Sequence, residues 1–219
     1  MSVVLLVRHG QASFGAEDYD QLSPLGSEQA RLLGSSLAAR GVRPEVVVRG
    51  SMKRHRQTAA AAVAGAGWDI DVVEDAAWDE FDHRTTLTGT VPSEGLAGLS
   101  YDEQVRRVET SIDRWASGKH DDDYRDSFPT FQARVSEAMS RLLAALGPKE
   151  TAVVFTSGGP VSWAAASLVD GGVPAWARLS RVVVNSSATK VVNGRRGTSL
   201  VSFNDHSHLE PSPDLITYR

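Results

Sequence analysis

The sequence predicts an α/β layered fold with a mainly parallel central sheet. Two observations carry this prediction: short apolar runs alternate with segments of helical periodicity, and the first run, residues 3–7, has no polar alternation. Alternating strands and helices are typical of parallel βαβ units, and a continuous apolar strand is typical of a sheet covered on both faces. With 219 residues and no internal repeat or linker, the chain is expected to form a single domain over residues 1–219.

The first half of the chain shows clear helix boundaries. Ser23 suits the N-cap of the first helix, Pro24 suits its first residue, and Gly41 is expected to end it. From residue 75 to residue 98 the pattern dissolves into Gly, Thr, Ser and Pro, so we expect an irregular loop or lid there. The other elements expected in this half are strands at residues 46–48 and 70–73 and a helix over residues 54–66.

The second half is predicted to contain more helices and a late group of strands. Ser100 and Glu103 have the spacing of a capping box, and an amphipathic helix is expected behind them. Other elements expected are a helix over residues 131–146, a strand at 152–155, a helix at 161–169, and strands at 182–184, 188–192 and 200–203. The last two strands are expected to form a hairpin across residues 193–194.

The composition excludes several classes of site and partner. The net charge is −4 with both signs mixed along the chain, which does not indicate a nucleic-acid partner. The chain has no cysteine, which excludes disulfides, thiolate metal sites and cysteine nucleophiles. The apolar run at residues 3–7 is too short for a signal segment or a membrane span, and no later run is long enough. We therefore expect a cytoplasmic protein with no membrane partner.

Two strand ends carry groups that suit an oxyanion. They are Arg8-His9-Gly10 after the first apolar run and Ser157-Gly158-Gly159 after the run at residues 152–155. The planar fork of an arginine can bind two phosphate oxygens, and glycines at a helix start offer backbone N–H groups to an anion. Because ligands of parallel sheets bind beyond the carboxyl ends of strands, we expect both groups to line one pocket.

Several motifs in this order and spacing resemble the histidine phosphatase superfamily, also called phosphoglycerate mutase-like. The motifs are Arg8-His9-Gly10, Leu22-Ser23-Pro24-Leu25-Gly26 with Gln29-Ala30, Arg54-His55-Arg56-Gln57-Thr58-Ala59, Trp78-Asp79-Glu80-Phe81, Asn185-Ser186-Ser187, and Asn204-Asp205 with His208-Leu209. The resemblance covers nearly the whole chain. It implies a three-layer α/β/α sandwich of phosphoglycerate mutase-like type.

The resemblance also implies a reaction, which is hydrolysis of a phosphomonoester through a phosphohistidine on His9. Arg8 and Arg54 would neutralise the phosphate charge, and Glu80 would act as the acid, although the Gly and Trp that often follow this acid are missing. Metal and cofactor are not needed. The phosphate contacts implied are Arg8, Gly10, Arg54, Ser157 and Gly158.

Ser157 departs from the family pattern, because it stands where the family has a second catalytic histidine. Loss of a charged donor there predicts weaker catalysis. His83 and His208 are candidates to replace the missing imidazole, whereas His55 and Arg56 are expected on the pocket rim or on a solvated helix face. The mutase branch fits less well, because residues 11–14 lack its longer stretch rich in Trp and Asn.

Two other functions stay open at this point. A module that binds a phosphorylated ligand without turnover is favoured by Ser157. A serine hydrolase is favoured by the order of Ser157, then Asp170 or Asp205, then His206 or His208. It is disfavoured because Phe155 stands where the nucleophile elbow needs Gly, and because the arginines near His9 would have no role.

The substrate expected is a small-molecule phosphomonoester. Candidate substrate contacts are Gln11, Ser13, His83 and Arg84, with Arg106 and Arg107 as further cations. Most of these lie in or near a lid-like insertion expected at about residues 82–128. The oligomeric state stays open, with a homodimer as one option.

Overall fold

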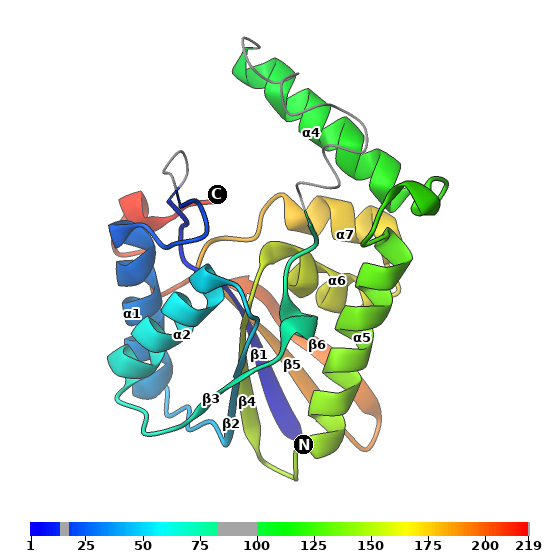
Figure 1. The fold of residues 1–219 in the computed structure, drawn as a ribbon. Coiled ribbons are helices and arrows are strands. Elements are labelled where there is room, and N and C mark those ends of the chain that lie inside the picture. Colours follow the sequence, from blue (N-terminus) through cyan, green and yellow to red (C-terminus); the bar gives the residue numbers. More distant parts are fainter. Residues whose placement is uncertain (14–17, 83–99, 219) are drawn as a thin grey trace. The chain divides into compact units, whose positions relative to one another are not determined.

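The computed structural model describes residues 1–13, 18–82 and 100–218. Its strands are β1 (Ser2–Arg8), β2 (Val46–Arg49), β3 (Val72–Glu74), β4 (Thr151–Thr156), β5 (Ala188–Gly194) and β6 (Gly197–Asp205). They form a six-stranded sheet of order β3-β2-β4-β1-β5-β6 in the described part of the chain (Figure 1). β3, β2, β4 and β1 are parallel neighbours, whereas β5 is antiparallel to β1 and to β6. The predicted α/β fold with a mainly parallel sheet is confirmed.

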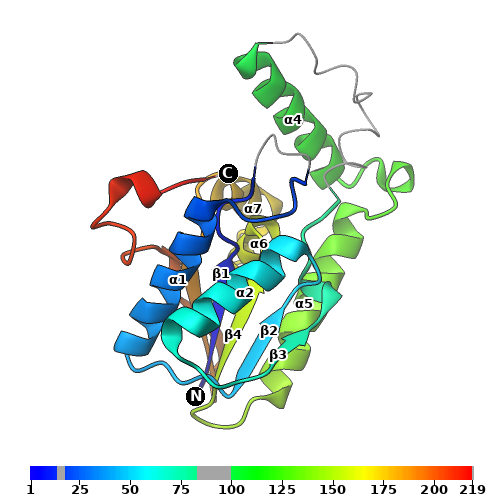
Figure 2. The ribbon, with the colours of Figure 1, turned by 60° about the vertical axis from the view of Figure 1, so that its left-hand side comes forward.

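Helices cover both faces of this sheet. On one face lie α1 (Pro24–Ala39) and α2 (Lys53–Ala66), and on the other lies α6 (Gly158–Leu168), followed by α7 (Gly172–Ser180) (Figures 1 and 2). Leu5 and Val7 of β1 belong to the core cluster that includes Leu33 and Leu37 of α1. Val4 and Leu6 of β1 point to the opposite face of the sheet and are also fully buried. β1 is thus buried on both faces, as its unbroken apolar run predicts.

The first helix begins as its cap sequence predicts. The Ser23 hydroxyl accepts a hydrogen bond from the backbone N–H of Gly26 at 3.0 Å, and Pro24 is the first helical residue. Gly41 follows the end of α1 with a φ of +77°, a conformation that glycine adopts without strain. The capping box also forms, because Glu103 accepts a hydrogen bond from the backbone N–H of Ser100 at 2.9 Å.

The strand predicted at residues 182–184 is wrong. Val183 and Val184 are fully buried but lie outside any strand. Their backbone groups bond to side chains instead: Arg8 donates to the Val183 carbonyl, and the Val184 N–H donates to Asn204 Oδ1 at 2.7 Å. Side chains thus satisfy the backbone groups that a neighbouring strand would otherwise bind. The apolar run can therefore be buried here without forming a strand.

The late hairpin forms, but its turn differs from the prediction. Gly194 pairs with Gly197, so the turn consists of Arg195 and Arg196 rather than residues 193–194. The helix α7 was not predicted, because its first residues, Gly172-Val173-Pro174, have the composition of a turn.

The chain divides into two compact units. The first comprises Met1–Glu80 and Glu137–Arg219, and the second comprises Phe81–Ser136. The second unit contains α4 (Tyr101–Ala116) and the first part of α5 (Phe128–Ala145). An aromatic cluster holds it together: Trp115 stacks on Phe81 at 4.4 Å and meets Phe128 edge-on at 4.8 Å, centroid to centroid.

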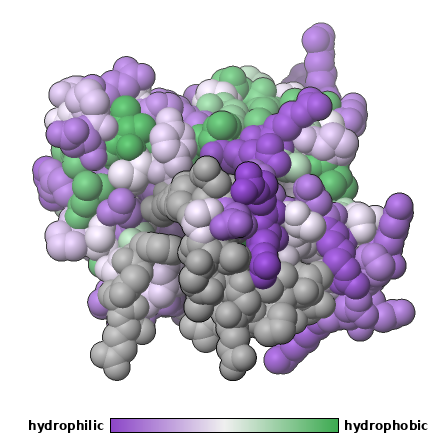
Figure 3. All heavy atoms as spheres, turned by 90° about the horizontal axis from the view of Figure 1, so that it is seen from above, coloured by the Kyte–Doolittle hydropathy of each residue, from purple (hydrophilic) through white to green (hydrophobic). Residues whose placement is uncertain are grey.

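The described helices and one face of the surface show how apolar and polar residues are distributed. Among the described residues, no helix combines the length and apolar content needed to cross a membrane. On the face drawn in Figure 3, hydrophilic residues cover much of the coloured surface, and smaller hydrophobic groups lie between them.

Candidate active site

The two polar strand ends meet at one edge of the sheet. Arg8 of β1 pairs with Thr156 of β4, and the His9 N–H donates to the Thr156 carbonyl at 2.8 Å. His9 and Ser157 therefore leave neighbouring parallel strands side by side. The structure brings the two groups together as the strand pattern predicts.

His9 is a buried, neutral imidazole with one free ring nitrogen in its preferred tautomer. Its side chain is 6% exposed, and Nδ1 lies 2.7 Å from the Gly10 carbonyl oxygen, to which it donates. This contact leaves the Nε2 lone pair unprotonated. Burial first, and then the charges of Arg54 and Arg8, hold the pKa of His9 well below its usual range. The ring therefore carries a free lone pair on Nε2 at neutral pH, which is what a nucleophile needs.

Arg8 lies beside the start of α6. One terminal nitrogen donates to the Val183 carbonyl and to the Tyr218 carbonyl, the latter at 3.0 Å. Nε is buried and finds no hydrogen-bond partner among the described residues. A Cβ on Gly158 would lie 3.6 Å from this Nε, so the guanidinium packs closely against the helix N-terminus. Burial lowers the pKa of Arg8 to about 10, which keeps it charged at neutral pH.

Arg54 supplies a second buried guanidinium from the first turn of α2. It is 6% exposed, and a terminal nitrogen donates to Asp20 Oδ1 at 2.7 Å. The other Asp20 oxygen accepts from the Lys53 N–H at 2.8 Å, which fixes the carboxylate. Nε of Arg54 is buried and lacks a partner in the described part of the chain. Two buried arginines, each with a donor that is unsatisfied among the described residues, thus lie near His9.

Glu80 lies at the N-terminus of α6. Its Oε2 accepts a hydrogen bond from the Gly159 N–H at 3.0 Å, and its charge partly offsets the lowering of the Arg8 pKa. A half-buried carboxyl group is therefore held near Arg8, where the predicted acid should lie.

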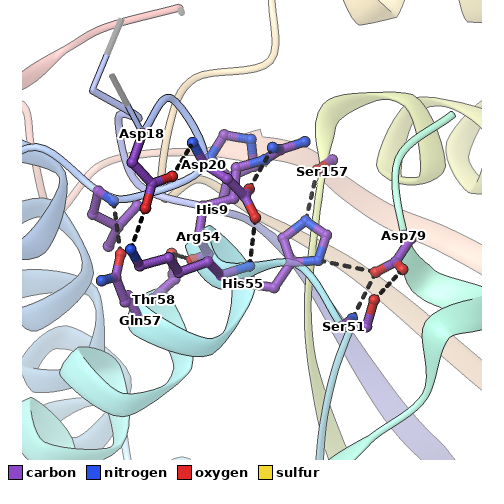
Figure 4. Close-up of polar contacts among 12 residues, drawn as sticks. His9, Asp18, Asp20, Ser51, Arg54, His55, Gln57, Thr58, Asp79 and Ser157 are labelled. Carbon is purple, nitrogen blue, oxygen red and sulfur yellow. Dashed lines mark hydrogen bonds and ion pairs between the residues drawn. The ribbon is translucent and has the colours of Figure 1, made fainter. Parts of the chain in front are cut away.

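His55 differs from its prediction. It was expected on the pocket rim or a solvated face, and this is wrong, because its side chain is fully buried. Its Nε2 lies 2.6 Å from the Ser157 hydroxyl oxygen, and its Nδ1 lies 3.6 Å from Asp79 Oδ1 (Figure 4). The ring centroids of His55 and His9 are 5.8 Å apart. His55 is therefore the imidazole that reaches Ser157.

The candidates named for that position lie elsewhere. His208 lies near Asp205, His206 and Arg40, and His83 is outside the described residues. The serine-hydrolase alternative combined Ser157 with Asp170 or Asp205 as the acid and with His206 or His208 as the base. In the structure Asp205 pairs with Arg40 at 3.0 Å, and His206 Nδ1 contacts the Asn204 carbonyl.

The other predicted contacts support the loop after β1. The Gly10 N–H donates to Thr58 Oγ1 at 3.1 Å, so it is already used within the protein. The Gln11 N–H donates to Gln29 Oε1 at 2.8 Å, and the Gln11 side chain accepts from Ser23. Ser13 pairs through its backbone with the Gln21 carbonyl at 2.8 Å. Arg84 is outside the described residues, and Arg106 and Arg107 belong to the second unit.

Asn185 contacts the backbone of His9, although the sequence indicates it only as part of a motif. Asn185 Nδ2 donates to the His9 carbonyl at 3.1 Å, and the Asn185 amide oxygen accepts from Thr217 at 2.9 Å. Asn185 thus ties the segment before β5 and the C-terminal segment to the backbone of His9.

Metal binding has no obvious donor set here. Among residues 1–13, 18–82 and 100–218, no group of three or more His, Cys, Asp or Glu side chains could hold a metal ion.

Comparison with known proteins identifies the family. A 2,3-bisphosphoglycerate-dependent phosphoglycerate mutase from Thermobifida fusca is 43% identical over 74 residues, which cover 31% of this chain and 30% of that relative. A phosphoserine phosphatase from Entamoeba histolytica, solved with 3-phosphoglyceric acid, is 22% identical with a TM-score of 0.64, covering 95% of this chain and 100% of its own. A phosphoglycerate mutase from Bacillus anthracis is 16% identical with a TM-score of 0.65, covering 95% of each chain. The model of the histidine phosphatase superfamily (branch 1) matches residues 4–206, and the chain belongs to that superfamily.

Proposed function

We propose that the protein hydrolyses phosphomonoesters through a phosphohistidine formed on His9. The observation that carries this proposal is a buried neutral imidazole whose Nε2 is unprotonated, near two arginines with unsatisfied donors. An in-line displacement needs a nucleophile with a lone pair and fixed positive charge around the phosphoryl oxygens. The free lone pair of His9 and the charges of Arg8 and Arg54 support this proposal.

The reaction has two displacements on phosphorus. First, the Nε2 lone pair of His9 attacks phosphorus, the bond to the ester oxygen breaks, and Glu80 in its protonated form gives its proton to the leaving oxygen. Then water attacks the phosphohistidine, the phosphorus–nitrogen bond breaks, and the Glu80 carboxylate takes the water proton. Arg8 and Arg54 neutralise the equatorial oxygens throughout. The scheme uses side chains of this chain and water alone, without a metal.

The matched relatives include both phosphatases and mutases, so the choice between them rests on the sequence. A mutase must hold the phosphoenzyme for a second substrate. The stretch after His9, residues 11–14, lacks the Trp- and Asn-rich extension of the mutase branch, which favours transfer to water. A small-molecule phosphomonoester is the proposed substrate class.

Trapping the phosphoenzyme tests this proposal. His9→Ala should abolish turnover of nitrophenyl phosphate and any acid-labile phosphoprotein recovered after rapid quench, while circular dichroism stays unchanged. His120→Ala, which removes an exposed histidine, is the matched control and should behave as the wild type. Normal turnover by His9→Ala would refute the mechanism. Phosphate binding without turnover in the wild type would favour the non-catalytic module instead.

A further inference from the structure

The hydrogen bond between Ser157 and His55 has no part in the proposed reaction so far. Both side chains are fully buried, and their heavy atoms are 2.6 Å apart. Ser157 is the N-cap residue of α6, next to Gly158, and Gly158 packs against Arg8. Ser157 therefore contacts the His55 imidazole and directly precedes the glycine that packs against Arg8.

Asp79 lies on the far side of the imidazole, and His55 Nδ1 is buried without a hydrogen-bond partner among the described residues. Asp79 Oδ1 accepts from the Ser51 N–H at 2.6 Å and lies 3.6 Å from His55 Nδ1. A Cβ on Gly50 would lie 2.3 Å from His55 Nδ1 and 2.5 Å from Asp79 Oδ1, so only glycine leaves room for this pair. Figure 4 shows the Asp79 carboxylate and the Ser157 hydroxyl at the two different ring nitrogens of His55.

The protonation state of His55 decides which way the Ser157 hydroxyl points. A neutral His55 with its proton on Nδ1, facing Asp79, has only a lone pair on Nε2, so Ser157 must donate to it. The hydroxyl hydrogen is then unavailable to an anion. A doubly protonated His55 donates from Nε2 to the Ser157 oxygen, and the hydroxyl hydrogen becomes free to turn toward the pocket.

The charges around His55 make its protonation state sensitive to a bound anion. Asp79 and Glu80 favour the protonated ring, whereas Arg54 disfavours it, and burial outweighs the carboxylates, so the pKa of His55 lies below its usual value. His9 also faces this ring. A bound dianion adds negative charge to the same pocket, and it therefore favours the doubly protonated ring.

We propose that His55 and Asp79 are positioning residues that act through Ser157. When a phosphate dianion enters, His55 takes up one proton from solvent, donates through Nε2 to the Ser157 oxygen, and leaves the hydroxyl hydrogen to donate to the anion. The pair of Ser157 and His55 thus supplies the charged donor that one histidine would supply. This inference rests on the proposed function, because it places the phosphoryl group beside Ser157.

Proton uptake on sulfate binding tests the inference. Sulfate is a tetrahedral dianion whose own charge stays constant near neutral pH, so calorimetry in two buffers of different ionisation enthalpy counts only protons taken up by the protein. The His9→Gln variant removes titration of the nucleophile. We expect uptake approaching about one proton per sulfate in His9→Gln and almost none in His9→Gln/His55→Gln. Equal uptake in both variants, or none in the first, would overturn the inference.

Nitrogen NMR of the histidine rings provides a second measurement on the unmutated protein. The His55 ring, identified by loss of its signal in His55→Gln, should change from a neutral to a doubly protonated pattern when sulfate is added. A ring that stays neutral in the sulfate complex contradicts the inference. Labelling of Ser157 by a fluorophosphonate would also overturn it, because the hydroxyl would then be a nucleophile with His55 as its base.

Moving the imidazole from position 55 to position 157 tests the positioning role by kinetics. His55→Ala should lower kcat/KM on nitrophenyl phosphate by ~10-fold or more, and Ser157→His in that background should restore part of it, because a charged donor returns to the pocket wall. Arg56→Ala, an exposed change on the same helix, is the control. Unchanged activity and pH profile in His55→Ala would refute the positioning role. Failure to trap a phosphohistidine would refute the proposed function alone. The proton uptake that accompanies sulfate binding needs no covalent step, so it tests the inference separately.

Discussion

At the residue scale, the two arginines act on both partners of the proposed reaction. Their charges lower the pKa of His9, after burial, and so keep its Nε2 lone pair free. The same charges attract the phosphate dianion, and each guanidinium has a buried Nε without a partner among the described residues. In the proposed reaction the same two cations would therefore serve both the nucleophile and the substrate.

Glu80 is tested by the leaving group. Nitrophenolate leaves without a proton, whereas an alkoxide needs one, so Glu80→Gln should slow an alkyl phosphate ~100-fold and nitrophenyl phosphate much less. Steady-state kcat/KM on both substrates measures the difference. Glu210→Gln, an exposed change, is the control. Equal losses on both substrates would assign the acid to another group. The candidates are then Asp79 and Asp82, the acidic neighbours of Glu80 in the sequence.

The candidate site could be predicted from the sequence where it depends on strand ends. Arg8, His9 and Ser157 follow apolar runs, and the parallel sheet brings such ends together. The role of His55 was missed, although a signal was present. His55 lies three, four and seven residues before Thr58, Ala59 and Ala62, which are all buried, so helical periodicity places it on the inner face of α2. Its contact with Asp79 depends on a loop, which periodicity does not determine.

At the element scale, the sequence predicts helices and strands well where the apolar pattern and the boundary residues indicate the same element. β1 and α1 have both an apolar pattern and clear boundary residues. The run at residues 182–184 has the apolar pattern alone, and distant side chains of Arg8 and Asn204 satisfy its backbone. Such bonds join residues about 20 or more positions apart, which local patterns cannot show.

The contact between α1 and α2 depends on a glycine in the middle of α1. A Cβ on Gly34 would lie 2.0 Å from the Ala62 carbonyl oxygen of α2. Gly→Ala in a helix normally gains about 1 kcal/mol, but a clash with backbone in a packed core costs about 1–3 kcal/mol or more. We expect the clash to dominate, so Gly34→Ala should lower the free energy of unfolding measured in urea. Ser27→Ala, on the exposed side of α1, should leave it within about 0.5 kcal/mol, and equal stability in both variants would contradict this packing argument.

At the scale of the whole molecule, buried neutral histidines make stability depend on pH. Burial lowers the pKa values of His9, His55 and His208 below the ordinary value of 6.5. In the unfolded chain these rings bind protons near pH 6.5, whereas in the folded protein they do so only at lower pH. The unfolded state therefore binds more protons as the medium becomes acidic, and the folded protein loses stability.

His208 isolates this effect, because it lies away from the candidate site. Burial lowers its pKa to about 4, with His206 and Arg40 adding to the shift and Asp205 opposing it. Its contribution to stability is complete above pH 6.5 and is lost as the pH falls from 6.5 to about 4, which amounts to about 2–3 kcal/mol. His208→Gln should therefore lose less stability than the wild type between these two pH values, as measured by urea unfolding. His120→Gln, which changes an exposed histidine, should lose as much stability as the wild type. If His208→Gln also loses as much stability as the wild type on acidification, groups other than His208 cause the loss.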